Sequence, residues 1–157
     1  MVEYEKNALT ADIEQFVEKY GRSRESLLPV LQDIQLKYRY ISSFAQQEVA
    51  RILDIHPVEV YGVTTFYSFL SAEPTGRYNV RLCRTISCDL SGKDAIVRAF
   101  ERELGIPFGQ TTRDNKFTLS YINCMGMCDQ GPAILVNDDV HTRLTPESVV
   151  DILQQYK

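Results

Sequence analysis

Two stretches, YNVRLCRTISCDL at residues 78–90 and FTLSYINCMGMC at residues 117–128, contain all four cysteines of the chain. In each stretch, a short run rich in β-branched and aromatic residues leads toward a pair of cysteines. Cys83 and Cys88 form a C-x4-C pair, and Cys124 and Cys128 form a C-x3-C pair. This pattern is typical of a strand followed by a loop that offers two thiols. We expect the two loops to meet and to enclose a metal centre.

The spacing of the cysteines leaves several kinds of site open. A [2Fe–2S] cluster needs four thiolates, two on each iron, and C-x4-C spacing also occurs in plant-type ferredoxins. Structural zinc also takes four thiolates, but usually with C-x2-4-C spacing, so the spacing favours the cluster over zinc. Redox-active or simply buried thiols are a third interpretation. Disulfides are disfavoured, because residues 1–10 lack the apolar run of a secretory signal and we expect a cytoplasmic chain with reduced thiols.

Size and composition exclude several classes of protein. At 157 residues the chain forms one domain or two small ones, and 44% hydrophobic with 24% charged residues is ordinary for a globular protein. Lys and Arg number 17 against 21 Asp and Glu, so the net charge of −4 argues against nucleic acid as a partner. No apolar run approaches the length of about 18 residues that indicates a membrane span, so we expect no direct membrane insertion.

The first 70 residues predict helices. Apolar residues recur at steps of three and four, and capping residues or prolines stand where such runs begin. The predicted starts are Thr10 for a helix ending at Tyr20, Ser26 for a helix with Pro29 in its first turn, a capping box at Ser43 and Gln46 for the third, and Pro57 for the fourth.

The uncharged run at residues 60–70 admits two interpretations. Helical spacing places Val63, Phe66 and Leu70 on one face, which we expect to be core. The remaining aromatic residues, Tyr61, Tyr67 and Phe69, are then partly exposed. An exposed apolar patch often marks an interface, whereas ordinary core is the alternative.

The second half predicts a small mixed sheet with helices against it. A polar linker with Pro and Gly at residues 71–77 separates it from the helices. The fold class is therefore α+β, with a helical domain and linker at 1–77 and an α/β domain at 78–157. The expected strands are 78–82, 117–122, 133–136 and 140–144. One helix is expected from a capping box at Ser91 and Asp94 to Gly105, and a second is expected to begin at Thr145 and Pro146.

The surroundings of the cysteines suit an anionic metal centre. The first cysteine loop ends where a helix is expected to start, and a helix N-terminus favours thiolates. Gly126 and Gly131 allow backbone N–H groups to approach the sulfurs. Arg84, beside Cys83, either raises the reduction potential of such a centre or is an ordinary surface arginine.

Other catalytic and binding motifs are absent from the sequence. His56 and His141 are not adjacent to a cysteine pair, which disfavours a Rieske-type site with two histidine ligands. The chain contains neither a G-x-G-x-x-G motif nor a nucleophile–base constellation. We therefore expect it to bind no nucleotide and to take no hydride by itself.

Several stretches together resemble one protein family. They cover about residues 25–155 and comprise LPVLQDIQ at 28–35, VYGVTTFY at 60–67, the C-x4-C pair, LGI at 104–106, FTL at 117–119, CMGMC at 124–128 and VN at 136–137. On these residues the chain resembles the thioredoxin-like [2Fe–2S] subunit of NADH dehydrogenase complexes. This family includes the E subunit of NADH–quinone oxidoreductase (complex I) and the related subunit of NAD(P)-linked hydrogenases and formate dehydrogenases.

The resemblance implies a helical N-terminal domain followed by a thioredoxin-like [2Fe–2S] ferredoxin domain. It implies one [2Fe–2S] cluster, with Cys83 and Cys88 on one iron and Cys124 and Cys128 on the other. It further implies an electron carrier that is not itself catalytic, in an NAD(P)H-dependent oxidoreductase, with a flavin-bearing, NAD(H)-binding partner subunit and further iron–sulfur subunits. The complex is expected in the cytoplasm or at the cytoplasmic face of the membrane.

The sequence also departs from the family pattern. Family members often have Gly-Thr and a following His in the first loop, where Arg84-Thr85 and Asp89 stand here. The second loop is followed here by Asp129-Gln130-Gly131-Pro132, where Ala-Pro is common in the family. The ligands are intact, but these changes bear on the reduction potential and on the complex that the subunit serves, and they slightly favour a soluble complex of the hydrogenase or formate dehydrogenase type.

Two rival functions belong to other classes. A zinc-stapled interaction module without a redox role uses the same four thiolates and predicts a colourless protein. A thioredoxin-like dithiol enzyme is disfavoured, because the chain lacks the C-x-x-C motif usual for that chemistry.

Overall fold

The computed structural model describes the backbone of residues 3–156 and the side chains of residues 6–156. The chain divides into two compact units, Met1–Pro74 and Thr75–Lys157, which we call the helical unit and the sheet unit. Each unit has its own cluster of buried apolar side chains. The division falls inside the linker expected at residues 71–77. No helix within the described residues is long and apolar enough to span a bilayer.

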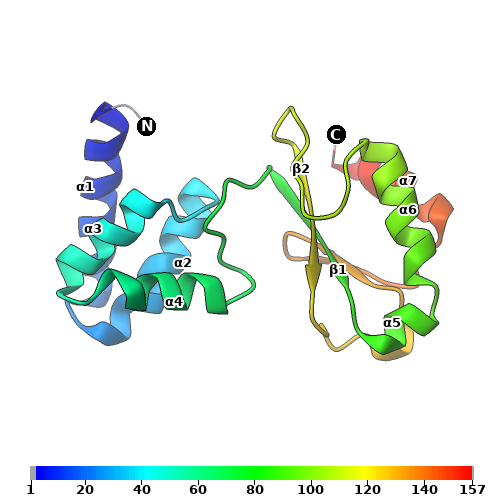
Figure 1. Ribbon diagram of the computed structural model, residues 1–157, viewed down its shortest axis with the longest axis horizontal. Helices are drawn as coiled ribbons and strands as arrows, with labels where there is room; N and C mark the ends of the chain where they lie inside the picture. Colours follow the sequence, from blue (N-terminus) through cyan, green and yellow to red (C-terminus); the bar gives the residue numbers. More distant parts are fainter. Residues whose placement is uncertain (1–2, 157) are drawn as a thin grey trace. The chain divides into compact units, whose positions relative to one another are not determined.

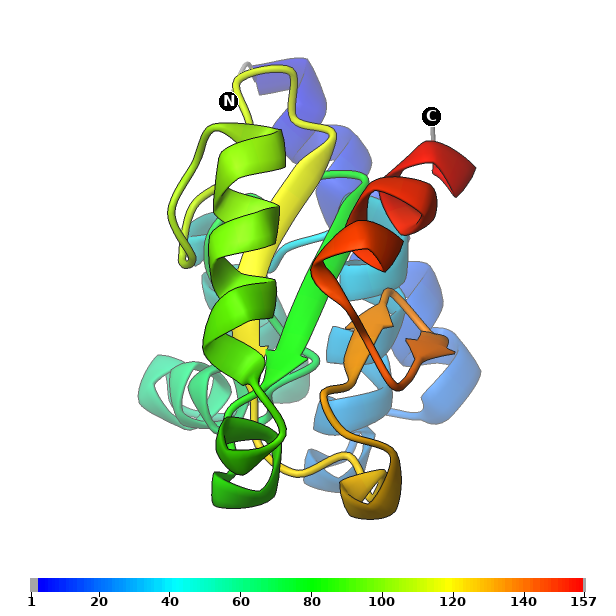
Figure 2. The same ribbon diagram turned by 90° about the vertical axis from the view of Figure 1, so that its right-hand side faces the viewer.

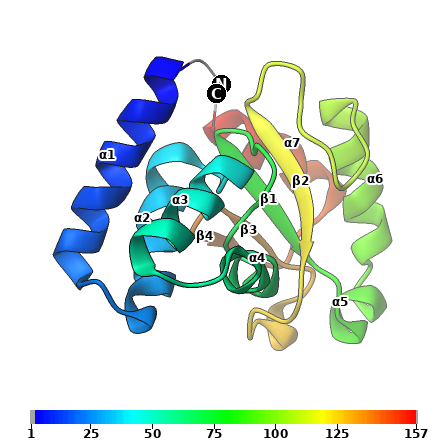
Figure 3. The same ribbon diagram turned by 60° about the vertical axis from the view of Figure 1, so that its left-hand side comes forward.

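The helical unit is built from helices that follow one another along the chain (Figures 1 and 3). α1 contacts both α2 and α3, and α3 also packs on α4, so each helix buries an apolar stripe against its neighbours. The fully buried side chains include Ile13, Val30, Ile34, Val49 and Val60. The elements are α1 (Glu3–Tyr20), a 3₁₀ turn (Arg24–Ser26), α2 (Leu27–Tyr38), α3 (Ser43–Leu53) and α4 (Pro57–Phe66).

Two of the predicted helix starts are wrong. α1 begins at Glu3, not at Thr10, because Leu9 extends the buried stripe of Ile13 and Val17 by one turn. Ser42, not Ser43, caps α3, since its hydroxyl accepts a hydrogen bond from the backbone N–H of Ala45 at 3.1 Å. The prediction for α4 is confirmed, with Pro57 at its first position.

The core face predicted for residues 60–70 is also wrong in part. Phe66 is 79% exposed, whereas Val60 and Thr64 face inward. The helix ends at Phe66 and the backbone of Tyr67 is extended, so one helical phase does not continue to Leu70. Leu70 is nevertheless buried, and Tyr61 and Phe69 are exposed as expected.

The sheet unit contains a four-stranded sheet in the order β2-β1-β3-β4. β1 (Tyr78–Cys83) pairs parallel with β2 (Phe117–Ile122) and antiparallel with β3 (Ile134–Val136), which pairs antiparallel with β4 (Asp139–His141). α6 (Lys93–Leu104) and α7 (Pro146–Gln155) pack on each other and cover one face of the sheet, as Figure 2 shows. The core lies between these layers and includes the fully buried side chains of Val80, Leu82, Phe100, Leu119 and Ile134.

The ends of several elements in the sheet unit differ from expectation. Ser91 does not cap the long helix, because a separate short helix, α5 (Ile86–Leu90), precedes it and Gly92 occupies the N-cap of α6 in the left-handed region. β4 ends at His141 rather than at Leu144, because residues 143 and 144 donate backbone hydrogen bonds to residues 130 and 132 instead. Gly105 ends α6 and Thr145 caps α7, as predicted.

The two adjacent serines before α3 provide a matched test of the cap. We expect Ser42→Ala to lower the free energy of unfolding of the helical unit by about 1 kcal/mol, because the N–H of Ala45 loses its acceptor. Ser43→Ala removes an exposed hydroxyl and is expected to stay within about 0.5 kcal/mol of the wild type. Urea unfolding followed by helical circular dichroism measures both; an equal loss in the two variants would contradict the assignment of the cap.

Candidate metal centre

The parallel pairing of β1 and β2 brings the two cysteine loops to one edge of the sheet. In this register Cys83 lies opposite Ile122, two residues before Cys124. Both strands therefore end at the same level, and both loops lie at the same end of the strands in Figure 2. The chain thus places cysteine pairs that are far apart in sequence on neighbouring strand ends, as the sequence predicted.

The first pair is buried. Cys83 is 2% exposed and Cys88 is 1% exposed. Cys83 is the last residue of β1, and Cys88 lies inside α5, with its backbone N–H bonded to the carbonyl of Thr85 at 3.0 Å. The expectation that this loop leads into the N-terminus of a long helix is therefore wrong, since α5 has only five residues.

The two thiols of the first pair differ in acidity. Burial raises the pKa of the Cys83 thiol, but hydrogen bonds from Thr85, Cys88 and the backbone of Met125 outweigh it, so that this pKa lies below its ordinary value. The Thr85 hydroxyl lies 3.2 Å from the Cys83 sulfur. Burial and the neighbouring Cys83 raise the pKa of Cys88. The hydrogen bonds thus favour negative charge on the Cys83 sulfur.

The second pair is exposed to solvent. The sulfurs of Cys124 and Cys128 lie 3.3 Å apart, and the interaction with Cys124 raises the pKa of Cys128. Gly126 has a φ of +85° and donates its backbone N–H to the Cys124 sulfur at 3.4 Å. Because this conformation favours glycine, the tight turn and the hydrogen bond depend on the same residue.

Three contacts connect the two loops. The backbone of Met125 hydrogen-bonds to Cys83, and the hydroxyl of Ser87 hydrogen-bonds to Cys128. Arg84 donates from Nε to Oδ1 of Asn123 at 3.2 Å. Arg84 is exposed, so its side chain bridges the loops at the surface and is not buried against the sulfurs.

The hydroxyl groups of Thr85 and Ser87 were not identified from the sequence. Both stand between the cysteines of the first pair, in the segment CRTISC. Their spacing resembles ordinary turn chemistry, and only the folded loop shows that one faces Cys83 and the other Cys128. The one signal for them in the sequence is a hydroxyl placed between two ligand cysteines.

The residues present fit a two-iron centre. The four sulfurs lie as two pairs, and each pair has backbone or hydroxyl donors that stabilise thiolates. Within residues 6–156, no three Cys, His, Asp or Glu side chains gather tightly enough to form a site for one ion. His141 hydrogen-bonds to Tyr156, and His56 lies in the helical unit at the start of α4. Two thiolates for each of two irons is the demand of a [2Fe–2S] cluster.

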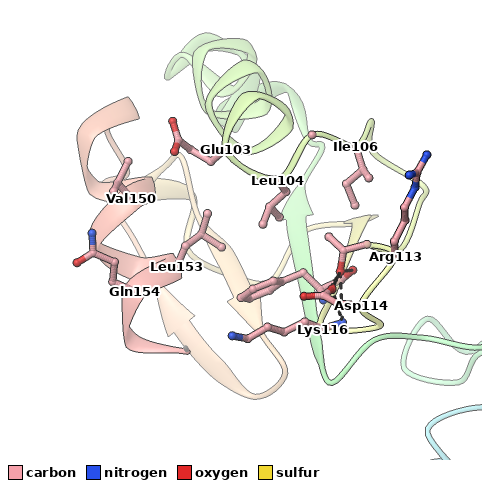
Figure 4. A pocket seen from close by; sticks show the side chains of 12 residues that line it. Glu103, Leu104, Ile106, Arg113, Asp114, Lys116, Val150, Leu153 and Gln154 are labelled. Atoms are coloured by element: carbon pink, nitrogen blue, oxygen red, sulfur yellow. Dashed lines mark hydrogen bonds between the residues drawn. The ribbon is translucent and has the colours of Figure 1, made fainter.

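A separate pocket of about 640 Å³ lies at the opposite end of the sheet unit (Figure 4). It is formed where β2 begins and where α6 and α7 approach their C-terminal ends. Its lining includes the apolar residues Leu104, Ile106 and Phe117 and the charged residues Arg113 and Lys116. No cysteine lines it, so it is distinct from the candidate metal centre.

The unequal burial of the two pairs predicts unequal reactivity in the chain from which iron has been removed. We expect a thiol-alkylating reagent to modify Cys124 and Cys128 at least about tenfold faster than Cys83 and Cys88, because a buried thiolate is shielded from the reagent. Mass spectrometry of peptides from a time course measures the four rates. Equal rates at native pH, becoming no faster in urea, would contradict the burial described here.

Comparison with known proteins places the chain in a family. The sequence model of the thioredoxin-like [2Fe–2S] ferredoxin family matches residues 13–157. The E subunit of NADH-quinone oxidoreductase from Buchnera aphidicola subsp. Acyrthosiphon pisum (strain APS) is 41% identical over 138 residues, which are 88% of this chain and 85% of that protein. The protein of the same name from Escherichia coli (strain K12) is 36% identical over 145 residues, covering 92% and 87% respectively.

A solved structure supports the fold. The air-oxidized NAD+-reducing [NiFe]-hydrogenase superposes with a TM-score of 0.68 and 22% sequence identity over 80% of this chain. The chain spans only 22% of the length of that hydrogenase chain, so the likeness concerns architecture alone. The expected α+β class with a thioredoxin-like domain is confirmed. The chain belongs to the thioredoxin-like [2Fe–2S] ferredoxin family, as its motifs predicted, and its cofactor is one [2Fe–2S] cluster.

Proposed function

We propose that this chain is the [2Fe–2S] electron-carrier subunit of a multisubunit NAD(P)H-dependent oxidoreductase. The observation that carries the proposal is the convergence of two cysteine pairs, on parallel strand ends, into one cluster-binding edge. A [2Fe–2S] cluster accepts and releases one electron. The two relatives named as the E subunit of NADH-quinone oxidoreductase support an oxidoreductase complex as the setting.

The ligands in this proposal are the four cysteines. Cys83 and Cys88 hold one iron from the buried side, and Cys124 and Cys128 hold the other from the exposed side. Hydrogen bonds from Thr85, Ser87, Gly126 and the backbone of Met125 stabilise the negative charge of the sulfurs. Residues 78–157 form the cluster domain, and residues 1–77 form a helical domain with its linker.

The proposed partner is a flavin-bearing, NAD(H)-binding subunit, with further iron–sulfur subunits in the same complex. This chain exchanges single electrons with the flavin and is not itself catalytic. It serves either NADH–quinone oxidoreductase or a soluble complex of the hydrogenase or formate dehydrogenase type. The two named sequence relatives support NADH–quinone oxidoreductase. The altered first cysteine loop slightly favours the soluble complex. We place the complex in the cytoplasm, because a site of four thiolates needs cysteines that stay reduced.

Part of the partner contact is proposed on α4. Val58 is 71% exposed, Tyr61 55% and Phe66 79%, and the rings of Phe66 and Tyr67 pack edge to face at 5.0 Å. An ion pair between Arg24 and Glu59 lies at 2.6 Å beside these residues, at the lining of a hollow of about 450 Å³. A contiguous apolar patch with a polar rim is typical of a protein–protein interface.

The ligand assignment is tested by replacing one cysteine at a time. We expect Cys124→Ser to lose at least about half of the bound iron and sulfide, because serine is a poor replacement for a thiolate ligand. The helical signal of the protein stays, since the helical unit has its own core. Iron, acid-labile sulfide and zinc per chain, with a visible spectrum before and after dithionite, measure the effect on protein purified without oxygen.

Met127→Leu serves as the control, because it changes the same loop without touching a sulfur ligand. Full iron content and an unchanged spectrum in Cys124→Ser would contradict the ligand assignment. If the wild type contains one zinc per chain and has no colour, the electron-carrier function is wrong and the zinc-stapled interaction module is supported.

The α4 patch is tested by placing a charge on it. We expect Phe66→Asp to weaken binding to the co-expressed flavin subunit at least about tenfold, equivalent to ~1.4 kcal/mol, since the charge loses its hydration in the interface. Val140→Asp, on an exposed apolar side chain of β4, is the matched control. Binding is measured by titration of the isolated subunits; equal affinities of Phe66→Asp and wild type would remove α4 from the interface.

A further inference from the structure

Residues 131–133 lie against both buried cysteines. The carbonyl of Ala133 accepts a hydrogen bond from the backbone N–H of Cys83 at 3.2 Å, and a Cβ at Gly131 would lie 3.4 Å from the sulfur of Cys88. Ala133 is 0% exposed, and Pro132 is also buried. One short segment, which precedes β3, therefore forms part of the protein wall around the first cysteine pair.

This segment is held in place from its other side. The backbone N–H of Arg143 donates to the carbonyl of Gln130 at 2.8 Å, and that of Leu144 donates to the carbonyl of Pro132 at 3.1 Å. The hydroxyl of Thr142 adds a bond to the side-chain oxygen of Gln130 at 3.3 Å. Because residues 142–144 anchor it, the segment cannot move away from Cys88 without breaking these hydrogen bonds.

Gly131 lies close to the Cys88 sulfur. A Cβ atom at this position would lie 3.4 Å from the Cys88 sulfur and 3.3 Å from the hydroxyl oxygen of Ser91. The φ angle of Gly131 is −68°, which any residue adopts, so space and not backbone strain is what favours glycine here. The Ser91 hydroxyl is on an exposed side chain and donates a hydrogen bond to the carbonyl of Ser87 at 2.8 Å, whereas Cys88 is buried within α5.

We propose that Gly131 is a positioning residue that acts through the Cys88 sulfur and sets the reduction potential of the cluster. The inference rests on the proposed role of Cys88 as a ligand. Hydrogen bonds to the sulfurs and the packing around them tune the potential of an iron–sulfur centre. A Cβ at position 131 would meet the Cys88 sulfur at 3.4 Å, and a larger side chain would press on that sulfur more strongly.

The test compares substitutions of increasing size in the purified, cluster-loaded chain. We expect Gly131→Ala to keep the iron and sulfide content of the wild type but to shift the midpoint potential and the electron paramagnetic resonance spectrum of the reduced form. Gly131→Val is expected to lose at least half of the iron. Gly62→Ala is the matched control, because a Cβ at Gly62 meets nothing within 4 Å; it should leave potential and spectrum unchanged.

The double variant Ser91→Ala/Gly131→Ala separates the two contacts. If the Cys88 sulfur is the responsible neighbour, the shift persists when the Ser91 hydroxyl is removed, and Ser91→Ala alone stays close to the wild type. A shift that disappears in the double variant would assign the effect to Ser91 and overturn the proposal. Wild-type potential and spectrum in both Gly131→Ala and Gly131→Val would overturn it as well.

Cys88→Ser, measured alongside, distinguishes this inference from the proposed function. Full iron in Cys88→Ser would contradict the ligand assignment, and the role of Gly131 would fall with it. Loss of iron in Cys88→Ser, together with unaltered Gly131 variants, would contradict the role of Gly131 alone.

Discussion

The parallel hydrogen-bonded register between β1 and β2 is the constraint on which the candidate metal centre depends. Two parallel strands of equal length end at one edge of the sheet, so whatever follows each strand meets there. Here each strand is followed by a loop with two thiols. The crossover helix α6 that makes the parallel pairing possible also supplies Ile96 and Phe100 to the core, so the same helix connects and stabilises the two strands.

The two cysteine pairs differ in environment in a way that suits an electron carrier. The protein encloses Cys83 and Cys88 between α5 and residues 131–133, whereas Cys124 and Cys128 face solvent on a loop built around Gly126. The buried pair gives a rigid base for the centre. In the proposed function, the exposed pair leaves one side of the centre open to a redox partner, and Ser87 and Gly126 donate to its sulfurs.

The helical and sheet units have separate cores, and the proposed functions divide between them. The sheet unit brings the four cysteines together through strand pairing. The helical unit leaves an apolar patch on α4, because the core is already filled by Val60 and Thr64 on the opposite side of that helix. In the proposed function, the sheet unit holds the cofactor and the helical unit contributes part of the partner contact.

The features that rest on local chemistry could be predicted from the amino-acid sequence. The cysteine pairs, the strand at residues 117–122, the end of α6 at Gly105 and the cap at Thr145 follow from residue types that act on their near neighbours. The motifs also identified the family and its cofactor. Local signals suffice for these features, because thiols, helix caps and turn glycines act through their own side chain or backbone on residues close in sequence.

Which faces and contacts the chain uses depends on packing between segments that are distant in sequence. Phe66 faces outward, because the packing of Val60 in the core sets which face of α4 is buried, and the spacing of the aromatic residues does not. The fold also makes Ser42, and not its neighbour, the cap, and it brings the hydroxyls of Thr85 and Ser87 to different sulfurs. The closeness of Gly131 to Cys88 also depends on the fold, because the two residues are 43 positions apart in sequence (131 − 88). A Cβ at position 131 would lie 3.4 Å from that sulfur only in the folded sheet, since distant segments meet through strand pairing and packing.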